Sequence, residues 1–223
     1  MGRVGQVGRA FYDRPTLEVA RDLLGKVLVH GTRSGRSSGM IVEVEAYIGE
    51  GDPACHAAPG PTRRNEPLYG PPGHAYVYLN YGIHALFNVV TEEEGRPAAV
   101  LIRALEPIDG FDGMRRRRRL ETRRAPGDGP SVHDLCRGPG NLTRALGITL
   151  AQNRIDLLGD RVFLEDHGHR VVEVGWGPRI GIARGADRPW RAWIAGHPAV
   201  SRPGTLRAPF SDPKGPSSSK MFG

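Results

Sequence analysis

The chain has 223 residues, of which 39% are hydrophobic, and this is enough for one domain with a packed core. The formal charge of +7 favours an anionic partner such as a phosphate backbone, although all but three of the 31 basic residues are arginines, a bias that a GC-rich genome also produces. Cys55 and Cys136 have no C-x-x-C spacing, which argues against a disulfide framework or a zinc site, and the lack of a signal peptide or membrane-spanning run predicts a cytoplasmic protein.

The first elements predicted along the chain are a helix and a hairpin. Residues 16–24 follow a capping residue, carry apolar side chains at helical spacing and end at Gly25, which predicts a short amphipathic helix. Residues 26–30 and 40–48 have the pattern of two half-buried strands joined by a polar turn. The Gly- and Pro-rich stretch 49–73 is then a long loop, of a kind that is usually functional or disordered.

Three further strands are predicted at residues 76–81, 86–91 and 98–105. The first of them is rich in tyrosine, and the last two flank a turn at residues 92–95. Because these connections are short, we expect the sheet to be antiparallel.

A basic segment and a glycine-rich segment follow these strands. Residues 109–119 contain a run of five arginines, which either contacts phosphate or forms a solvated helix face. One helix is predicted to begin at residues 131–135, and residues 138–141 lead into another that ends at Gly147. The free N–H groups of such a glycine-rich entry suit a phosphate oxygen, but many helices simply begin in this way.

The last part of the chain is predicted to return to the sheet and then to lose regular structure. Later strands are expected at residues 160–165, 171–174, 179–183 and 190–194. The final residues mix Pro, Gly and Ser without an apolar period. We therefore expect one domain over residues 1–205 and a flexible tail over residues 206–223.

The strand at residues 40–48 carries two glutamates, and side chains two residues apart point to the same side of a strand. One face is therefore expected to hold Ile41, Glu43, Glu45 and Tyr47. The other is expected to hold Val42, Val44 and Ala46. Two acids and a tyrosine on one face need a polar cleft or solvent, so this strand is the first candidate for chemistry.

Arg103 lies in the apolar strand at residues 98–105, where it is expected to share a face with Ala99, Leu101 and Leu105. A guanidinium on such a face must find an anion or suffer a heavy desolvation penalty. With the tyrosine cluster between the acidic strand and Arg103, the pattern predicts an aromatic pocket with one catalytic carboxylate.

Several ordered motifs together resemble the alkyladenine DNA glycosylases, also called 3-methyladenine or methylpurine DNA glycosylases. The resemblance covers residues 11–201, and it depends on the agreement of the whole series because each motif alone is weak. The motifs are residues 42–49 (VEVEAYIG), His56, 76–82 (YVYLNYG), 88–90 (NVV), 100–107 (VLIRALEP), 137–140 (RGPG) and 178–182 (PRIGI).

The resemblance implies a mixed α/β (α+β) fold in a single domain, with a curved, mostly antiparallel sheet surrounded by helices, as in the C-terminal domain of formyltransferases. It implies an enzyme that takes damaged purines out of double-stranded DNA and hydrolyses the N-glycosidic bond, with no metal or other cofactor. The substrates implied are 3-methyladenine, 7-methylguanine, hypoxanthine and ethenoadenine. We expect such a protein to act as a monomer, without contact to a membrane, on the DNA of the nucleoid.

The resemblance also implies roles for individual residues. The catalytic ones are Glu45, which activates water, and Arg103, which helps to hold that water. The base pocket is implied to consist of Tyr47, His56, Tyr78 and Asn88, the last of which crowds out the exocyclic amine of guanine. The residues implied to contact DNA are Tyr81, which fills the space of the flipped nucleotide, and Gly138, Gly140 and Asn141.

These residue types suit the reaction. Breaking an N-glycosidic bond builds positive charge on the sugar, and a carboxylate both stabilises that charge and activates water. Tyrosine and histidine rings attract a cationic alkylated purine by stacking and by cation–π interaction. No lysine lies in the motif region, which argues against a Schiff-base lyase and predicts an intact abasic strand as the product.

The sequence departs from the family pattern at three places and leaves two other functions open. Asn141 stands where many relatives have a lysine, and residues 92–97 and 121–130 are peculiar to this chain. A non-catalytic nucleic-acid-binding module would share this fold. A metal-dependent hydrolase could use Asp52 and His56 with the two glutamates of the acidic strand, although the ligand spacing of such sites is absent.

Overall fold

The computed structural model describes residues 5–32, 35–122 and 131–202, and for residues 119–122 it describes the backbone alone. The helices are α1 (Arg9–Tyr12), α2 (Thr16–Leu23), η1 (Glu66–Tyr69), α3 (Phe111–Thr122), α4 (Val132–Leu135), α5 (Pro139–Leu146) and η2 (Leu150–Gln152). The strands are β1 (Val27–Thr32), β2 (Gly35–Ile48), β3 (Ala75–Asn80), β4 (His84–Val90), β5 (Ala98–Asp109), β6 (Val162–Glu165), β7 (Val174–Gly177) and β8 (Arg191–Ile194).

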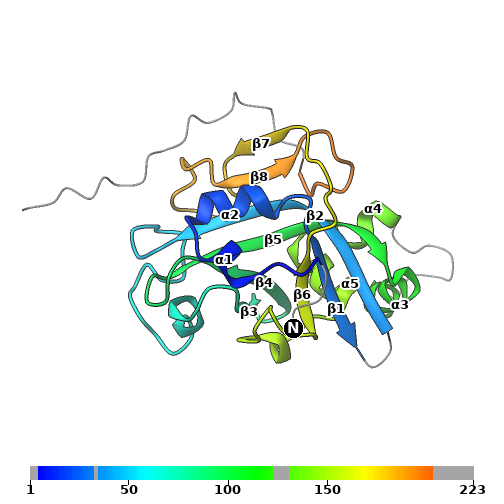
Figure 1. Cartoon of the computed structure of the whole chain (residues 1–223), viewed down its shortest axis with the longest axis horizontal. Coiled ribbons are helices and arrows are strands. Elements are labelled where there is room, and N and C mark those ends of the chain that lie inside the picture. The colour runs from blue at the N-terminus through cyan, green and yellow to red at the C-terminus, as the bar shows by residue number, and fades with distance from the viewer. Residues whose placement is uncertain (1–4, 33–34, 123–130, 203–223) are drawn as a thin grey trace, which may run out of the picture.

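One curved sheet organises the chain as a single α+β domain (Figure 1). Its main strand order is β3-β4-β5-β2-β1-β6, and every strand pairing in the described residues is antiparallel. The long strand β2 pairs with β5 along one edge, while its other edge pairs first with β1 and then with β8. The expected fold class is therefore confirmed, and β2 is the strand to which the rest of the sheet is attached.

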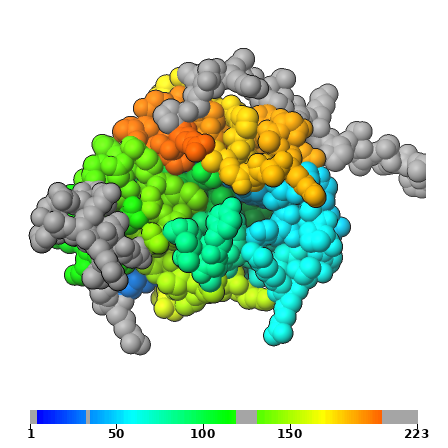
Figure 2. Space-filling model, turned by 180° about the vertical axis from the view of Figure 1, so that it is seen from behind, coloured from blue at the N-terminus to red at the C-terminus, as the bar shows by residue number. Residues whose placement is uncertain are grey.

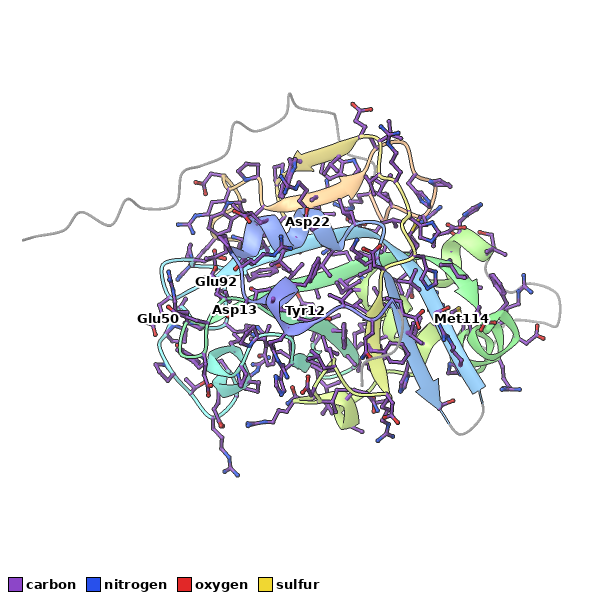
Figure 3. The ribbon with its side chains drawn as sticks, in the orientation of Figure 1. Tyr12, Asp13, Asp22, Glu50, Glu92 and Met114 are labelled. Carbon is purple, nitrogen blue, oxygen red and sulfur yellow. The ribbon has the colours of Figure 1, made fainter. Side chains whose placement is uncertain are left out.

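The main core lies between the sheet and the helices α2 and α5. Apolar side chains of both helices belong to the same buried cluster as Val44 of β2 and Ile102 of β5. Tyr12 of α1 and Met114 of α3 extend this cluster, and both are fully buried (Figure 3). The opposite side of β2 and β5 is thus left for other residues, and there the acids lie.

A β-bulge corrects the expected faces of the acidic strand. The pairing of β2 with β5 shifts register between Ile41 and Glu43 and again between Glu43 and Val44. As a result, Ile41 lies in the main core with Val44, whereas Val42 packs on the other side of the sheet against Trp193. The prediction that Ile41 shares the face of the glutamates was wrong, because a bulge interrupts strict alternation.

The same irregularity changes the surroundings of Arg103. Leu105 packs in the main core with Ile102 and does not share a face with Arg103, and Arg103 has no pairing partner on β2. An unpaired residue in a bulged pair can be aimed in a direction that regular pleating does not allow. Here the irregularity directs the guanidinium toward both glutamates.

Most of the predicted elements are present, with some differences. The predicted helix at residues 16–24 is α2; Pro15 occupies its N-cap position without a capping side chain, and Gly25 at φ +84° follows its end. The strand expected at residues 171–174 is shifted to β7, and residues 179–183 form no strand. The expected tail at residues 206–223 and most of the segment 121–130 lie outside the described residues. Within the described residues, none of the helices has the length and apolarity needed to cross a bilayer.

Candidate active site

Glu45 is buried in the middle of a hydrogen-bonded cluster. The Tyr47 hydroxyl donates to its Oε2 at 2.9 Å, and Arg103 Nη1 lies 3.1 Å from the same oxygen. The backbone N–H of Ile180 donates to Oε1 at 2.6 Å. A carboxylate offers about four acceptor positions, so these three partners leave one position on Oε1 for a further donor such as water.

Glu43 lies behind Glu45 and is held by different partners. Its Oε1 accepts hydrogen bonds from Arg103 Nε and from Arg191 Nη1, each at 3.1 Å. Its Oε2 accepts from the backbone N–H of Ser201 at 2.7 Å. Glu43 therefore anchors the back of Arg103, and Glu45 is the acid that the structure connects to Tyr47.

The four residues expected to form the base pocket line one cavity. Tyr47 enters from β2, His56 from the loop after it, Tyr78 from β3 and Asn88 from β4. The cavity has a volume of about 30 Å³, and its other lining residues are Ala54, Cys55, Leu68, Tyr76 and Ala99. Because Tyr47 both lines the cavity and donates to Glu45, the carboxylate is one side chain away from this space.

His56 and the tyrosines form one aromatic group. The His56 ring lies 4.4 Å from the Tyr78 ring, and its Nδ1 is 2.8 Å from the hydroxyl of Tyr76. Burial lowers the pKa of His56, and the nearby Arg64 cation lowers it further. At neutral pH the pocket therefore contains a neutral imidazole, which can hydrogen-bond to a base without adding charge.

Burial also controls the state of the tyrosines. It raises the pKa of Tyr76 to about 12, and it raises the pKa of Tyr47 still further, assisted by the neighbouring Glu45 carboxylate. The pKa of Tyr78 is raised as well, chiefly by burial. All three hydroxyls stay protonated at neutral pH, so that of Tyr47 can serve only as a donor to the acid.

A buried ion pair that the sequence analysis did not single out closes the other side of the site. Arg179 donates to both carboxylate oxygens of Asp52, at 2.5 and 2.7 Å, and its guanidinium carbon lies 4.6 Å from the centre of the Tyr47 ring. Asp52 was considered only as a metal ligand, and its oxygens are instead engaged by Arg179 and by backbone N–H groups. No group of three or more potential metal-ligating His, Cys, Asp or Glu side chains forms anywhere in the described parts of the chain.

The residues expected to contact DNA lie outside the cavity, around the β3–β4 hairpin. Tyr81 is at the tip of this hairpin, 87% exposed and with a left-handed φ of +50°. Figure 2 shows this hairpin standing out from the face seen from behind, beside the cyan segment that follows β2. An exposed aromatic ring on a projecting turn is geometrically suited to enter a duplex.

Helix α5 begins next to the hairpin. Gly138 occupies its N-cap at φ +95°, and a Cβ at Gly140 would lie 3.2 Å from the ring of His84, the first residue of β4. The Asn141 side chain donates to the carbonyl of Arg137 at 2.7 Å, so its amide N–H is turned back onto its own segment. The three residues are thus together, and Asn141 is the one whose side chain is engaged locally.

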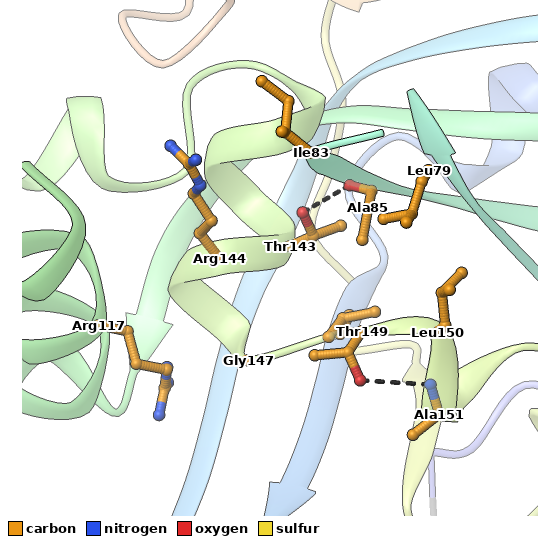
Figure 4. Close-up of a pocket in the computed structure, with 11 residues that line it drawn as sticks. Leu79, Ile83, Ala85, Arg117, Thr143, Arg144, Gly147, Thr149, Leu150 and Ala151 are labelled. Carbon is orange, nitrogen blue, oxygen red and sulfur yellow. Dashed lines mark hydrogen bonds between the residues drawn. The ribbon is translucent and has the colours of Figure 1, made fainter. Parts of the chain in front are cut away.

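A larger groove of about 570 Å³ lies beyond the hairpin, between β3, α5 and η2 (Figure 4). Leu79, Ile83 and Leu150 give it an apolar lining, and Arg117 and Arg144 are its charged residues. Arg117 donates to the carbonyl of Ala145 and to Ser37 Oγ, so this member of the arginine run is partly structural. Neither lining contains a carboxylate, but Tyr47 of the smaller cavity donates a hydrogen bond to Glu45, and no lining residue of the groove has such a link to a buried acid among the described contacts. We therefore place the chemistry at the smaller cavity.

Comparison with known proteins identifies the family. The sequence profile of the methylpurine-DNA glycosylase (MPG) family matches residues 10–198. Proteins named "Putative 3-methyladenine DNA glycosylase" from Chlorobaculum tepidum and Methanocella arvoryzae are 47% and 48% identical to the chain, covering 88% and 87% of it and 91% and 94% of their own lengths. One of the same name from Bradyrhizobium diazoefficiens is 49% identical over 87% of the chain and 90% of its own length. The chain belongs to the methylpurine-DNA glycosylase family and is a DNA glycosylase, an enzyme that hydrolyses N-glycosyl bonds.

Proposed function

We propose that this protein flips alkylated or deaminated purines out of duplex DNA and hydrolyses their N-glycosidic bond with a water activated by Glu45. The observation that carries the proposal is the position of the Glu45 carboxylate, which is fully buried, bonded to Tyr47 and separated from an aromatic cavity by that side chain alone. A base in the cavity would bring its sugar to the mouth of the pocket, within reach of the acid.

Glu45 and Arg103 have separate tasks in this mechanism. The fourth acceptor position of Glu45 takes a water proton, which makes the oxygen a better nucleophile for the anomeric carbon. The negative charge also stabilises the oxocarbenium-like transition state. Arg103 Nη1, 3.1 Å from Glu45, pairs with the buried carboxylate and contributes a donor for the attacking water.

The pocket residues recognise the base by shape and stacking. The rings of Tyr47, Tyr78 and neutral His56 provide flat apolar surfaces for a purine. Asn88 donates to the Tyr76 carbonyl at 3.0 Å, which fixes its amide against the edge of the cavity. We assign to this fixed side chain a penalty against the exocyclic amine of guanine. The same amine is present in 7-methylguanine, whose positive charge makes it a better leaving group, so the penalty acts mainly against undamaged guanine.

The duplex is held by the hairpin and by α5. Tyr81 fills the gap that the flipped nucleotide leaves, and the N–H groups at Gly138 and Gly140 bind a backbone phosphate at the helix N-terminus. Asn141 contributes less, because its amide already donates to Arg137. A single copy provides all of these contacts, so we propose that the protein acts as a monomer on chromosomal DNA, in the cytoplasm.

An excision assay tests the function directly. Duplexes carrying 3-methyladenine, 7-methylguanine, hypoxanthine or ethenoadenine are incubated with the protein, and free base and alkali-labile sites are measured. We expect base release with an intact strand, and no covalent adduct after borohydride treatment. Nicking of abasic DNA together with borohydride trapping would refute the hydrolytic mechanism.

The variant Glu45→Gln separates a glycosylase from a DNA-binding module. It keeps the size of the side chain but removes the base, so the excision rate should fall by about 10²-fold or more while affinity for lesion-containing duplex is retained. Glu43→Gln is the matched comparison, because the same change is made two residues away on the same strand, at an acid that binds Arg103, Arg191 and the backbone of Ser201 and for which no hydrogen bond with Tyr47 is found in the described residues. Equal loss in both variants would contradict the assignment of Glu45 as the base.

A further inference from the structure

Arg64 is a cation held at the aromatic pocket by a rigid piece of loop. Its neighbour Asn65 is buried and donates to the carbonyls of His56 and Gly60 at 2.7 and 2.9 Å, while its Oδ1 accepts from the backbone N–H of Thr62. These bonds fix the backbone that carries Arg64. The Arg64 guanidinium carbon lies 5.9 Å from the centre of the Tyr78 ring, at the outer limit of a cation–π contact.

Arg64 differs from the other arginines at the site in having no acid to neutralise it. Arg103 and Arg191 are paired with the two glutamates, and Arg179 is paired with Asp52. Among the described residues no carboxylate lies within ion-pair distance of Arg64, and its side chain is exposed. The positive charge of Arg64 would therefore act on a base in the pocket without a paired carboxylate to neutralise it.

The field of Arg64 reaches the pocket residues. Desolvation is the largest cause of the lowered pKa of His56, and the positive charge of Arg64 is the second. The same charge opposes the rise that burial produces in the pKa values of Tyr76 and Tyr78. The 5.9 Å between the Arg64 guanidinium carbon and the centre of the Tyr78 ring is shorter than the Debye length of about 8 Å in physiological salt, so a base stacked on this ring would lie in the field of Arg64. Screening is then incomplete, and the sign of the charge on the base matters.

We propose that Arg64 is a specificity-determining residue that disfavours cationic purines in the pocket relative to neutral ones. The inference rests on the proposed function and refines its substrate class. Purines alkylated at N7 carry a positive charge in DNA, whereas hypoxanthine is neutral. Arg64 repels the former and engages a tyrosine face that would otherwise stabilise them, so its charge shifts the relative excision rates toward the deaminated and cyclised lesions.

Three variants test this assignment. Arg64→Gln removes the charge, Arg64→Lys retains it, and Arg63→Gln removes a neighbouring charge that is also exposed and for which no contact with a pocket ring is found in the described residues. Single-turnover excision rates are measured for each variant on duplexes with 7-methylguanine and with hypoxanthine. We expect Arg64→Gln to raise the ratio of the first rate to the second by about fivefold, and the other two variants to leave this ratio at the wild-type value.

The salt dependence gives a second readout. Because Arg64 is exposed, added salt should raise the same ratio in the wild type and change it little in Arg64→Gln. The inference is overturned if the ratio of the two excision rates in Arg64→Gln equals that of the wild type. If, in addition, both rates fall by one common factor and depend less steeply on salt, Arg64 is identified as a phosphate contact. Failure of the proposed function would look different, since the wild type would then release neither base.

Discussion

At the scale of single residues, Arg103 is the group that allows two carboxylates to share the interior. Its Nε contacts Glu43 and its Nη1 contacts Glu45, and both acids are fully buried. The guanidinium pairs with both acids at once, and buried charges are tolerated only when they are paired. Arg191 provides a second cation for Glu43. Among the described residues, Arg103 is the one arginine within 4 Å of Glu45.

Arg103→Met should therefore damage both folding and catalysis. It leaves Glu45 as a buried charge without a paired cation, a type of change that costs about 3 to 5 kcal/mol. We expect the free energy of unfolding measured in urea to fall by an amount in this range, and excision to be lost. Arg103→Lys is the comparison: it restores the charge but not the two-pronged geometry, so it should recover much of the stability and less of the activity. Wild-type stability in Arg103→Met would contradict this view of the cluster.

At the scale of elements, the β3–β4 hairpin has an exposed tip and a base that lines the aromatic cavity. Tyr81 is 87% exposed at its tip, whereas Tyr76 and Tyr78 at its base line the cavity. The left-handed φ of +50° at Tyr81 is a strained conformation for a residue with a bulky side chain. A strained, exposed tyrosine contributes little to stability, and this agrees with the proposed role of Tyr81 in contacting DNA.

Tyr81→Ala should slow excision from duplex DNA. The free energy of unfolding should change by no more than about 0.5 kcal/mol, so the melting temperature should be almost unchanged. The ring is expected to fill the space of the flipped nucleotide, a task that single-stranded DNA does not require. Excision from a single strand should therefore be affected much less than excision from a duplex. Tyr81→Gly, which tolerates positive φ, should melt slightly higher than Tyr81→Ala with the same enzymatic defect. An equal loss on single and double strands would be evidence against the wedge.

The same scale shows what local sequence patterns predict and what they miss. The strands at β2, β3, β4 and β5 follow from apolar and aromatic runs, and short connections predicted their antiparallel pairing. The faces around Glu43 and Arg103 were partly wrong, because period-2 alternation contains no information on a bulge.

Long-range pairs were missed for a related reason. Asp52 and Arg179 are 127 residues apart, and their ion pair is formed only when the loop after β2 meets the segment before β8. Neither position shows a periodic signal. The base-pocket residues were predicted through the family motifs, and their shared cavity supports this assignment. Tyr76 and Cys55 line the same cavity, and Tyr76 lay within a quoted motif without being singled out.

At the scale of the whole molecule, buried histidines predict how stability depends on pH. His30 is buried, donates from Nδ1 to the carbonyl of Leu146 at 2.9 Å, and has no partner for Nε2 among the described residues. A proton on Nε2 would be a buried and unpaired charge. Burial accordingly lowers the pKa of His30, and burial is also the main cause of the lowered pKa values of His56 and His197.

The sign of the effect follows from which state binds more protons. Below the ordinary histidine pKa of 6.5 the unfolded chain takes up protons that the folded chain does not. The free energy of unfolding should thus be highest above pH 6.5 and fall as the pH decreases toward 5, by up to about 1.4 kcal/mol per pH unit for each such histidine. Urea unfolding at pH 7.5, 6.5 and 5.5 measures this slope. The variant His30→Gln should have a shallower slope; an unchanged slope would exclude His30 as a contributor.

The small size of the aromatic cavity has a consequence for inhibition. Its volume of about 30 Å³ is room for roughly one water molecule, far less than a purine needs. In the proposed mechanism the walls therefore separate before a base enters, and the binding energy for this can come from contacts along the DNA strand. A free purine brings no such contacts, so the excised base should be a weak competitive inhibitor of DNA binding. The abasic strand keeps these contacts, and its dissociation from the enzyme should therefore limit turnover.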